Sequence, residues 1–264
     1  RLRKSLGQHL LVSPGVLQDI VNAAELTPDD LVLEVGPGTG LLTTRLAENA
    51  GMVVAVEIDH DMAQLARLVV KEWASVSVIE GDILRQDIPE LTHGRQYSVV
   101  ANLPYNIASP TIRMFLEAEN QPNRMVVTVQ REVAQEMCAA PGGLGLLGIS
   151  IQVYSVPHIV RRVAAGSFRP PPKVESAVVR LDVREVPLVP RDLMGPFFRT
   201  VRAAFGSPRK QLRNSLSHGL GIAATDVERW LVAVGVDPTR RPETLSIDEW
   251  RSMVQTRPDL LPSS

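Results

Sequence analysis

The chain has 264 residues and a net charge of −1, and its 44% hydrophobic and 22% charged side chains are typical of a globular protein with one large domain or a large and a small one. No uninterrupted apolar run approaches the roughly 20 residues of a membrane helix, and the single Cys138 can form neither an intramolecular disulfide nor a zinc site. Membrane-spanning and disulfide-rich secreted proteins are therefore excluded, and we expect a cytoplasmic protein.

The first half of the chain alternates short apolar runs with helical patterns. Runs rich in Val and Ile, bounded by turn residues, predict buried strands over residues 31–35, 52–58, 75–80, 97–101 and 125–130. Between them, apolar residues at helical spacing predict helices, for example over residues 40–50 and 59–74. This alternation indicates an α/β fold with a mostly parallel, doubly wound sheet.

After residue 150 the pattern changes. Residues 158–163 and 176–183 predict two more strands, and the three prolines between them predict a rigid extended loop. From Pro190 onward, Gly and Pro separate short helices over residues 196–206, 209–220, 224–235 and 246–256. The chain therefore divides into a large α/β domain over residues 1–186 and a small all-helical domain over residues 187–264.

The charge is unevenly distributed along the chain. Residues 1–90 carry 7 basic and 14 acidic side chains, whereas residues 91–184 carry 10 and 6, and residues 185–264 carry 11 and 9. Residues 161–173 hold four basic side chains and residues 199–213 hold five, and neither segment contains an acid. One such run is most simply a solvated face, but two of them on a nearly neutral chain favour a polyanionic partner.

Three glycines follow the first predicted strand, in the sequence LEVGPGTG. Gly36, Gly38 and Gly40 let the turn pass close to a ligand, and the following helix start presents free N–H groups. A dinucleotide fingerprint needs its third glycine at position 41, which is Leu41 here. The spacing therefore favours S-adenosylmethionine over NAD.

Acidic side chains end the next two strands. Glu57, about 20 residues after Gly36, can accept hydrogen bonds from ribose hydroxyls. Asp82 can bind an adenine amino group or position the loop around it. Each carboxylate alone is more simply a helix N-cap or a solvated acid, but successive strand ends with such groups favour a nucleoside site.

The fourth strand ends in NLPY. Asn102 and Tyr105 should face the same crevice, because ligands bind at the carboxyl ends of such strands. The Asn102 amide and the carbonyl of Leu103 or Pro104 can hold both hydrogens of an exocyclic amine, while Tyr105 offers a flat face to a base. An isolated motif of this kind is more simply a capped loop with a half-buried Tyr. Here it predicts a holder for a planar ring that carries an amino group.

Motifs along nearly the whole chain resemble one family: VLEVGPGTG, VVAVEID, EGDIL, NLPYNIASP, SFRPPPKVESAVVRL, AAFGSPRKQLRNSL and RPETLSIDEW. In this order and spacing they resemble the KsgA-type ribosomal RNA adenine dimethyltransferases. The resemblance implies a seven-stranded, Rossmann-like S-adenosylmethionine methyltransferase domain over residues 1–186, and an RNA-contacting helical domain over residues 187–264. It also implies N6,N6-dimethylation of two adjacent adenines near the 3′ end of 16S ribosomal RNA, coupled to small-subunit biogenesis. We expect a monomer that uses no metal ion.

The resemblance assigns cofactor contacts to His9, Leu11, Gly36, Gly38, Glu57, Asp82 and Asn102. Residues 8–11 depart from the family, because they read Gln-His-Leu-Leu where the usual motif is Gln-Asn-Phe-Leu. A histidine can still donate or accept hydrogen bonds, and a surface position is the alternative. A second departure lies in residues 141–150, where Leu144, Leu146 and Leu147 stand in place of a Lys and a Tyr-Gly pair.

The expected reaction is direct transfer of the sulfonium methyl group to adenine N6, with catalytic residues Asn102, Leu103, Pro104 and Tyr105. Hydrogen bonds from the amine favour a pyramidal nitrogen whose lone pair faces the methyl group, and positioning of this kind contributes about 7–11 kcal/mol in good cases.

The target base must leave its stack to react. Tyr105 and Phe168 are expected to stack on it, with ordinary core packing as the alternative for Phe168. Phosphates are expected to bind Arg209, Lys210 and Arg213.

Three other functions stay open at this point. One is the related class that methylates 23S ribosomal RNA and confers macrolide resistance. Another is a ribosome assembly factor that only binds RNA, although the intact NLPY and glycine turn argue against it. The third is a nicotinamide oxidoreductase, which the missing third glycine disfavours.

Overall fold

The computed structural model describes residues 9–256, which divide into two compact units. The first unit holds the residues up to Gln135 together with Ser155–Glu185, and the second holds Glu136–Tyr154 together with the residues from Val186 onward. The segment Glu136–Tyr154 thus groups with the helical unit, which differs from a single division at residue 186. Backbone hydrogen bonds account for this grouping, because Gly142 N–H donates to the Glu243 carbonyl over 2.8 Å.

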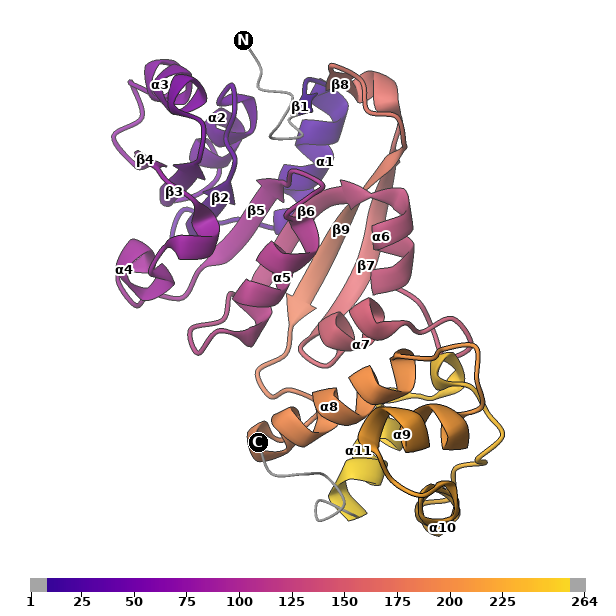
Figure 1. Ribbon diagram of the computed structural model, residues 1–264. Coiled ribbons are helices and arrows are strands. Elements are labelled where there is room, and N and C mark those ends of the chain that lie inside the picture. The colour runs from indigo at the N-terminus through magenta and orange to yellow at the C-terminus, as the bar shows by residue number, and fades with distance from the viewer. Residues whose placement is uncertain (1–8, 257–264) are drawn as a thin grey trace. The chain divides into compact units, whose positions relative to one another are not determined.

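The first unit is built on a seven-stranded mixed sheet of order β4-β3-β2-β5-β6-β9-β7 (Figure 1). Its strands are β2 (Leu31–Val35), β3 (Met52–Glu57), β4 (Val76–Glu80), β5 (Ser98–Asn102), β6 (Arg124–Gln130), β7 (Ser155–Val163) and β9 (Ser176–Val183). Strands β2 to β6 are parallel, and β9 is antiparallel to both β6 and β7. The prediction of a doubly wound sheet with seven strands is confirmed.

The register of the parallel strands brings their carboxyl ends to one edge of the sheet. Val35 pairs with Val56 on one side and with Ala101 on the other. The glycine turn that follows β2 therefore lies between the Glu57 end of β3 and the Asn102 end of β5.

Helices cover both faces of this sheet (Figure 1). Side chains alternate along a strand, so Val100 packs with α1 (Pro14–Ala24) on one face, while Tyr97 contacts Phe115 of α5 (Ala108–Glu117) on the other. The other helices between the strands are α2 (Leu41–Ala47), α3 (His60–Val69), α4 (Ile88–Thr92) and α6 (Arg131–Met137).

Helix α1 follows directly from its sequence. Pro14 fits the first helical turn, where its missing N–H needs no partner. The helix ends at Glu25, which adopts the left-handed conformation with a φ of 48°. Its buried side chains recur at helical spacing and form one apolar face: Val16, Leu17, Ile20, Val21 and Ala24.

A short antiparallel ribbon ties the start of the described chain to the proline-rich loop. It consists of β1 (Leu10–Leu11) and β8 (Phe168–Arg169), with Leu11 opposite Phe168. Strands of two residues carry no periodic pattern, which is why sequence analysis did not predict them.

The second unit is helical. Its helices are α7 (Leu146–Gln152), α8 (Met194–Phe205), α9 (Leu212–Leu220), α10 (Ala224–Ala233) and α11 (Ile247–Thr256). Trp230 and Trp250 fill its core, and the Trp230 indole N–H donates to the Met253 carbonyl over 2.9 Å. The four predicted C-terminal helices are confirmed, and α7 is an additional one. No helix within residues 9–256 has the length and apolar character that a bilayer crossing requires.

Candidate active site

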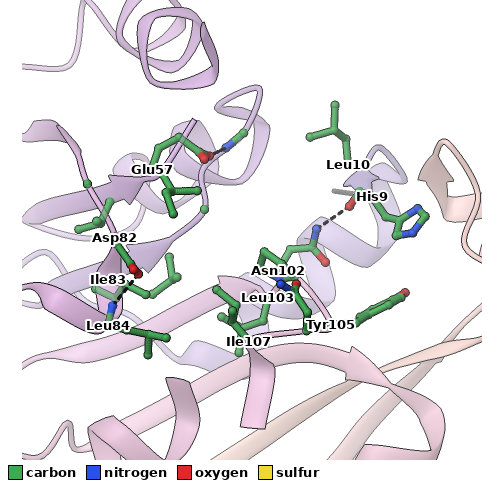
Figure 2. Close-up of a pocket in the computed structure, with 18 residues that line it drawn as sticks. His9, Leu10, Glu57, Asp82, Ile83, Leu84, Asn102, Leu103, Tyr105 and Ile107 are labelled. Atoms are coloured by element: carbon green, nitrogen blue, oxygen red, sulfur yellow. Dashed lines mark hydrogen bonds between the residues drawn. The ribbon is translucent and has the colours of Figure 1, made fainter. Parts of the chain in front are cut away.

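A pocket opens at the carboxyl edge of the parallel strands (Figure 2). It brings together six of the seven residues expected to contact a cofactor: His9, Gly36, Gly38, Glu57, Asp82 and Asn102. The seventh, Leu11, is buried in the wall of a smaller cavity nearby, and its neighbour Leu10 lines the pocket.

The glycine turn requires glycine at its centre. Gly38 has a φ of 54°, and a Cβ atom there would lie 2.9 Å from Cδ2 of Leu10. The turn also uses its own N–H groups: Gly36 donates to Val56 O over 2.9 Å, and Gly38 to Glu57 Oε2 over 3.0 Å. Gly40 donates to the Pro37 carbonyl. The three glycine N–H groups are therefore occupied within the protein and cannot serve a pyrophosphate as they do in dinucleotide sites.

Glu57 lies at the end of β3 and is buried, with 3% of its surface exposed. Its two carboxylate oxygens accept one backbone N–H each, from Gly38 and from Asp59, both over 3.0 Å. Burial raises the pKa of Glu57, and these backbone hydrogen bonds oppose that rise. Each oxygen retains a further lone pair, so the carboxylate can accept both hydroxyls of a ribose.

Asp82 positions the loop after β4 and also faces the pocket, while its contact with an adenine amine stays a prediction. Its Oδ1 accepts the Leu84 N–H over 3.0 Å and so caps η2, a single 3₁₀ turn over Ile83–Arg85, while the residue also lines the pocket. Two apolar side chains in the same wall are exposed to solvent: Ile58 is 52% exposed and Leu84 39%. They offer a flat ring the apolar surface that a base buries on binding. Neither side chain is marked by a sequence pattern, since each follows a strand end without any periodic signal.

The charge of the pocket is negative. Glu57 and Asp82 line it, and among the described residues on its walls there is no Lys or Arg. Phosphates would be repelled from such a site, whereas a ligand with a positive charge is attracted. The residues present therefore fit S-adenosylmethionine, a sulfonium nucleoside, better than a dinucleotide.

Asn102 is held in one orientation. Its Nδ2 donates to the backbone carbonyl of His9 over 2.9 Å (Figure 2). Because a carbonyl can only accept, the nitrogen must point to His9, and Oδ1, which bonds to no other group within residues 9–256, can accept a hydrogen from a ligand. The end of β5 thus presents an oriented hydrogen-bond acceptor beside the nucleoside site.

Both the ring and the hydroxyl group of Tyr105 are held by neighbouring side chains. Its ring stacks on the His9 imidazole, with 5.6 Å between ring centroids and 30° between planes. Its hydroxyl lies 2.6 Å from Oγ of Ser176 on β9. The His9 Nδ1–H in turn donates to the Pro170 carbonyl over 2.8 Å. Burial raises the pKa of Tyr105, so the phenol is neutral. His9 covers one face of the Tyr105 ring, and a base can stack only on the other.

Other residues named by sequence analysis lie outside the pocket. Phe168 is fully buried in the core with α1 and does not present a ring to a base. Arg209 and Lys210 are exposed on the turn between α8 and α9 in the second unit. Arg213 pairs with Glu228, with 2.8 Å between Nη1 and Oε2. Of the expected phosphate ligands, Arg209 and Lys210 are thus the more available.

Fold and pocket together define the class of Rossmann-like, S-adenosylmethionine-dependent methyltransferases. The family described as "Ribosomal RNA adenine dimethylase" matches residues 1–257. The chain belongs to this ribosomal RNA adenine dimethylase family.

Individual relatives agree with this assignment. "Ribosomal RNA small subunit methyltransferase A" of Dehalococcoides mccartyi is 44% identical over 254 residues, which cover 96% of this chain and 87% of the relative. The protein of the same name from Alkaliphilus metalliredigens is 39% identical, covering 97% of this chain and 91% of that one.

Two solved structures are similar over nearly the whole chain. A dimethyladenosine transferase from Plasmodium falciparum has a TM-score of 0.80 at 25% identity, covering 96% of this chain and 98% of its own. The 23S rRNA methyltransferase ErmE has a TM-score of 0.74 at 27% identity, and the match covers 93% of this chain and 98% of ErmE.

Proposed function

We propose that the protein transfers methyl groups to N6 of two adjacent adenines near the 3′ end of 16S ribosomal RNA, and that it acts in small-subunit biogenesis. The observation that carries this proposal is the Asn102 amide, whose nitrogen is bonded to His9 and whose oxygen is free to accept an amine hydrogen. Relatives named as small-subunit methyltransferases at up to 44% identity support the choice of RNA.

The cofactor would be held by the residues that fit it in the pocket. Glu57 would accept the ribose hydroxyls, Asp82 would bind the adenine amine, and Ile58 and Leu84 would cover the ring. His9, Gly36, Gly38, Asn102 and, from the adjoining cavity, Leu11 would surround the rest of the molecule. S-adenosylmethionine supplies the electrophilic methyl group.

The protein would position the attacking amine. Asn102 Oδ1 accepts one N6 hydrogen and a carbonyl of the NLPY turn accepts the other. The Pro104 carbonyl already accepts the Ile107 N–H over 3.1 Å, which makes Leu103 the better second acceptor. Two acceptors below the amine direct its lone pair toward the methyl group. No strong base is required beforehand, because the nitrogen becomes acidic once it is alkylated.

The target adenine would stack on the face of Tyr105 that His9 leaves open, a contact worth roughly 1–3 kcal/mol. Phe168 is buried, so the base has Tyr105 as its aromatic partner among the residues proposed for stacking. Arg209 and Lys210 would bind phosphates of the RNA, with a smaller contribution from Arg213, whose charge is shared with Glu228.

Methylation mapping tests the proposal. Purified protein is incubated with labelled S-adenosylmethionine and either undermethylated small subunits or large subunits, and the label is located by nuclease mapping. We expect N6,N6-dimethyladenine at two adjacent positions near the 3′ end of 16S RNA. Label in 23S RNA alone would favour the activity suggested by the similarity to ErmE. Subunit binding without any transfer would favour an assembly factor.

The proposal includes action by a monomer in the cytoplasm, where ribosomal subunits are assembled. Light scattering of the free protein and of its complex with small subunits checks the monomeric state.

A further inference from the structure

Glu34 is a buried acid that the proposed reaction does not use. It lies within β2, two residues before Gly36, and only 1% of its surface is exposed. Its Oε2 reaches no hydrogen-bond partner within the described part of the chain, and the Thr43 hydroxyl on α2 is buried close to the carboxyl group. An ionised carboxylate in this position would lack the hydrogen bonds that normally stabilise it.

Glu34 faces a small cavity that adjoins the proposed cofactor pocket. The cavity measures about 30 Å³, room for one or two water molecules. Gly36, Gly38 and Asn102 line both this cavity and the larger pocket. A cation in the pocket is therefore separated from Glu34 by little more than the glycine turn, where low polarity makes the interaction of charges strong.

The surroundings of Glu34 favour its neutral form. Burial raises its pKa to about 8, the Thr43 hydroxyl lowers it in part, and repulsion from Glu57 raises it further. The other titratable side chains that line the two cavities are Glu57, Asp82, His9 and Tyr105, and none of the described lining residues is a Lys or Arg. The protein therefore supplies no basic side chain there to balance a negative charge on Glu34.

We propose that Glu34 makes the cofactor site selective for charge. Its carboxyl group is neutral in the cofactor-free protein, releases its proton to solvent when the sulfonium cation binds, and takes a proton up again when the product occupies the site. Methyl transfer turns the sulfonium into an uncharged thioether, so the ligand loses one positive charge. Glu34 thereby favours S-adenosylmethionine over S-adenosylhomocysteine and assists their exchange. This inference rests on the proposed cofactor site but not on the identity of the RNA.

Calorimetric titration tests the inference without any methyl transfer. S-adenosylmethionine and S-adenosylhomocysteine are each titrated into the full chain at pH 7, in phosphate and in Tris, whose ionisation enthalpies differ. For the native protein we expect release of about one proton with the first ligand and clearly less with the second. Glu34→Gln should abolish this difference and reduce the preference for S-adenosylmethionine by roughly three- to tenfold.

Two further variants make the result specific. Glu48→Gln makes the same substitution at an exposed position at the end of α2, and its titrations should match those of the native protein. Since the ionised form of Glu34 favours the sulfonium cation, the affinity for S-adenosylmethionine should rise with pH as Glu34 loses its proton. Thr43→Val removes the one hydroxyl that lowers the Glu34 pKa, so it should move this rise in affinity to higher pH. It also serves as the test if Glu34→Gln does not fold.

Equal proton release by the native protein and by Glu34→Gln would overturn the inference, because titration of the ligand ammonium group is common to both. Equal release for the two ligands would overturn it as well. Failure of the native protein to bind S-adenosylmethionine at all would be a different result, since it would overturn the proposed cofactor site itself.

Discussion

At the scale of single residues, the pocket depends on which way each polar group points. The Asn102 oxygen is available because its nitrogen is bonded to the His9 carbonyl, and the Tyr105 ring is held between His9 and Ser176. His9 thus contributes to both ends of the NLPY turn through its backbone and its ring. The bond to Asn102 uses the backbone carbonyl of His9, so it does not depend on which side chain stands at this position.

Replacing Asn102 tests the proposed amine holder. Asn102→Ala should lower the rate of methyl transfer by about 10²–10³-fold, the usual effect of removing one oriented hydrogen-bonding group from a reaction centre. S-adenosylmethionine binding should remain measurable by calorimetry, because Glu57 and Asp82 are unchanged. Asn49→Ala, which removes an exposed amide on the surface, is the matched control. Turnover near that of the native protein would remove Asn102 from the mechanism.

Glu34 should make the stability of the cofactor-free protein depend on pH. Its pKa is raised from 4.5 to about 8 in the folded state, so between these values the unfolded chain loses a proton that the folded protein keeps. Stability from this group is therefore lost as pH rises, by about 1.4 kcal/mol per pH unit and about 3 kcal/mol in total at pH 7.

Denaturant unfolding from pH 5 to pH 8 checks this expectation. Glu34→Gln should be more stable than the native protein at pH 7. This difference should shrink toward pH 5, because the Glu34 carboxyl then keeps its proton in a larger share of the unfolded molecules as well as in the folded protein. A constant difference between the two proteins across this range would contradict it.

At the scale of elements, the site is made where strands end and turns begin. The parallel register places the turns after β2, β3 and β5 side by side, and the β1–β8 ribbon brings His9 and Leu10 to the same edge. The glycine turn after β2 is closely fitted to Leu10 and Glu57, so a change in it should affect cofactor binding directly.

Gly38→Ala tests that fit. The alanine would hold a φ of 54° at a cost of about 1–2 kcal/mol, and its Cβ would press on the Leu10 side chain from 2.9 Å. We expect at least a tenfold loss of S-adenosylmethionine affinity by calorimetry, together with a lower Tm. Gly166→Ala serves as the control, since its added Cβ has no described atom within 4 Å apart from those of its own chain neighbours. Similar losses in both variants would mean that the turn has no special fit to the ligand.

At the scale of the whole molecule, charge is separated along the chain. Residues 1–90 have 14 acidic and 7 basic side chains, in keeping with a pocket that suits a cation, whereas residues 185–264 have 9 and 11. This separation agrees with the proposal that a cationic cofactor binds the first part and a polyanionic RNA the last.

Salt dependence tests this separation. The double variant Arg209→Ala/Lys210→Ala should weaken binding to small-subunit RNA and reduce the slope of log affinity against log salt by roughly 1.5–2. Arg213→Ala should have a smaller effect, because that guanidinium is paired with Glu228. Arg85→Ala removes an 85% exposed charge near the acidic pocket and should leave the slope unchanged. An unaltered slope in the double variant would place Arg209 and Lys210 outside the RNA interface.

The order of strands and helices could be predicted from the sequence alone. Apolar runs of four to seven residues and helical spacing are local patterns, and the buried strands of a parallel sheet repeat them clearly. The glycines, Glu57, Asp82 and Asn102 could be found as well, because a parallel sheet brings the ends of its strands to one edge.

Only the tertiary structure decided which single side chains are buried and which partners they have. Phe168 is drawn into the core by pairing with Leu11, and Arg213 is drawn to Glu228, through contacts between segments far apart in the chain. The sequence shows Glu34 as an acid within the apolar run LVLEV, yet only the tertiary structure shows that its carboxyl group is buried and that Oε2 bonds to none of residues 9–256. Local patterns specify elements because they depend on neighbours in sequence, whereas burial and charge depend on neighbours in space.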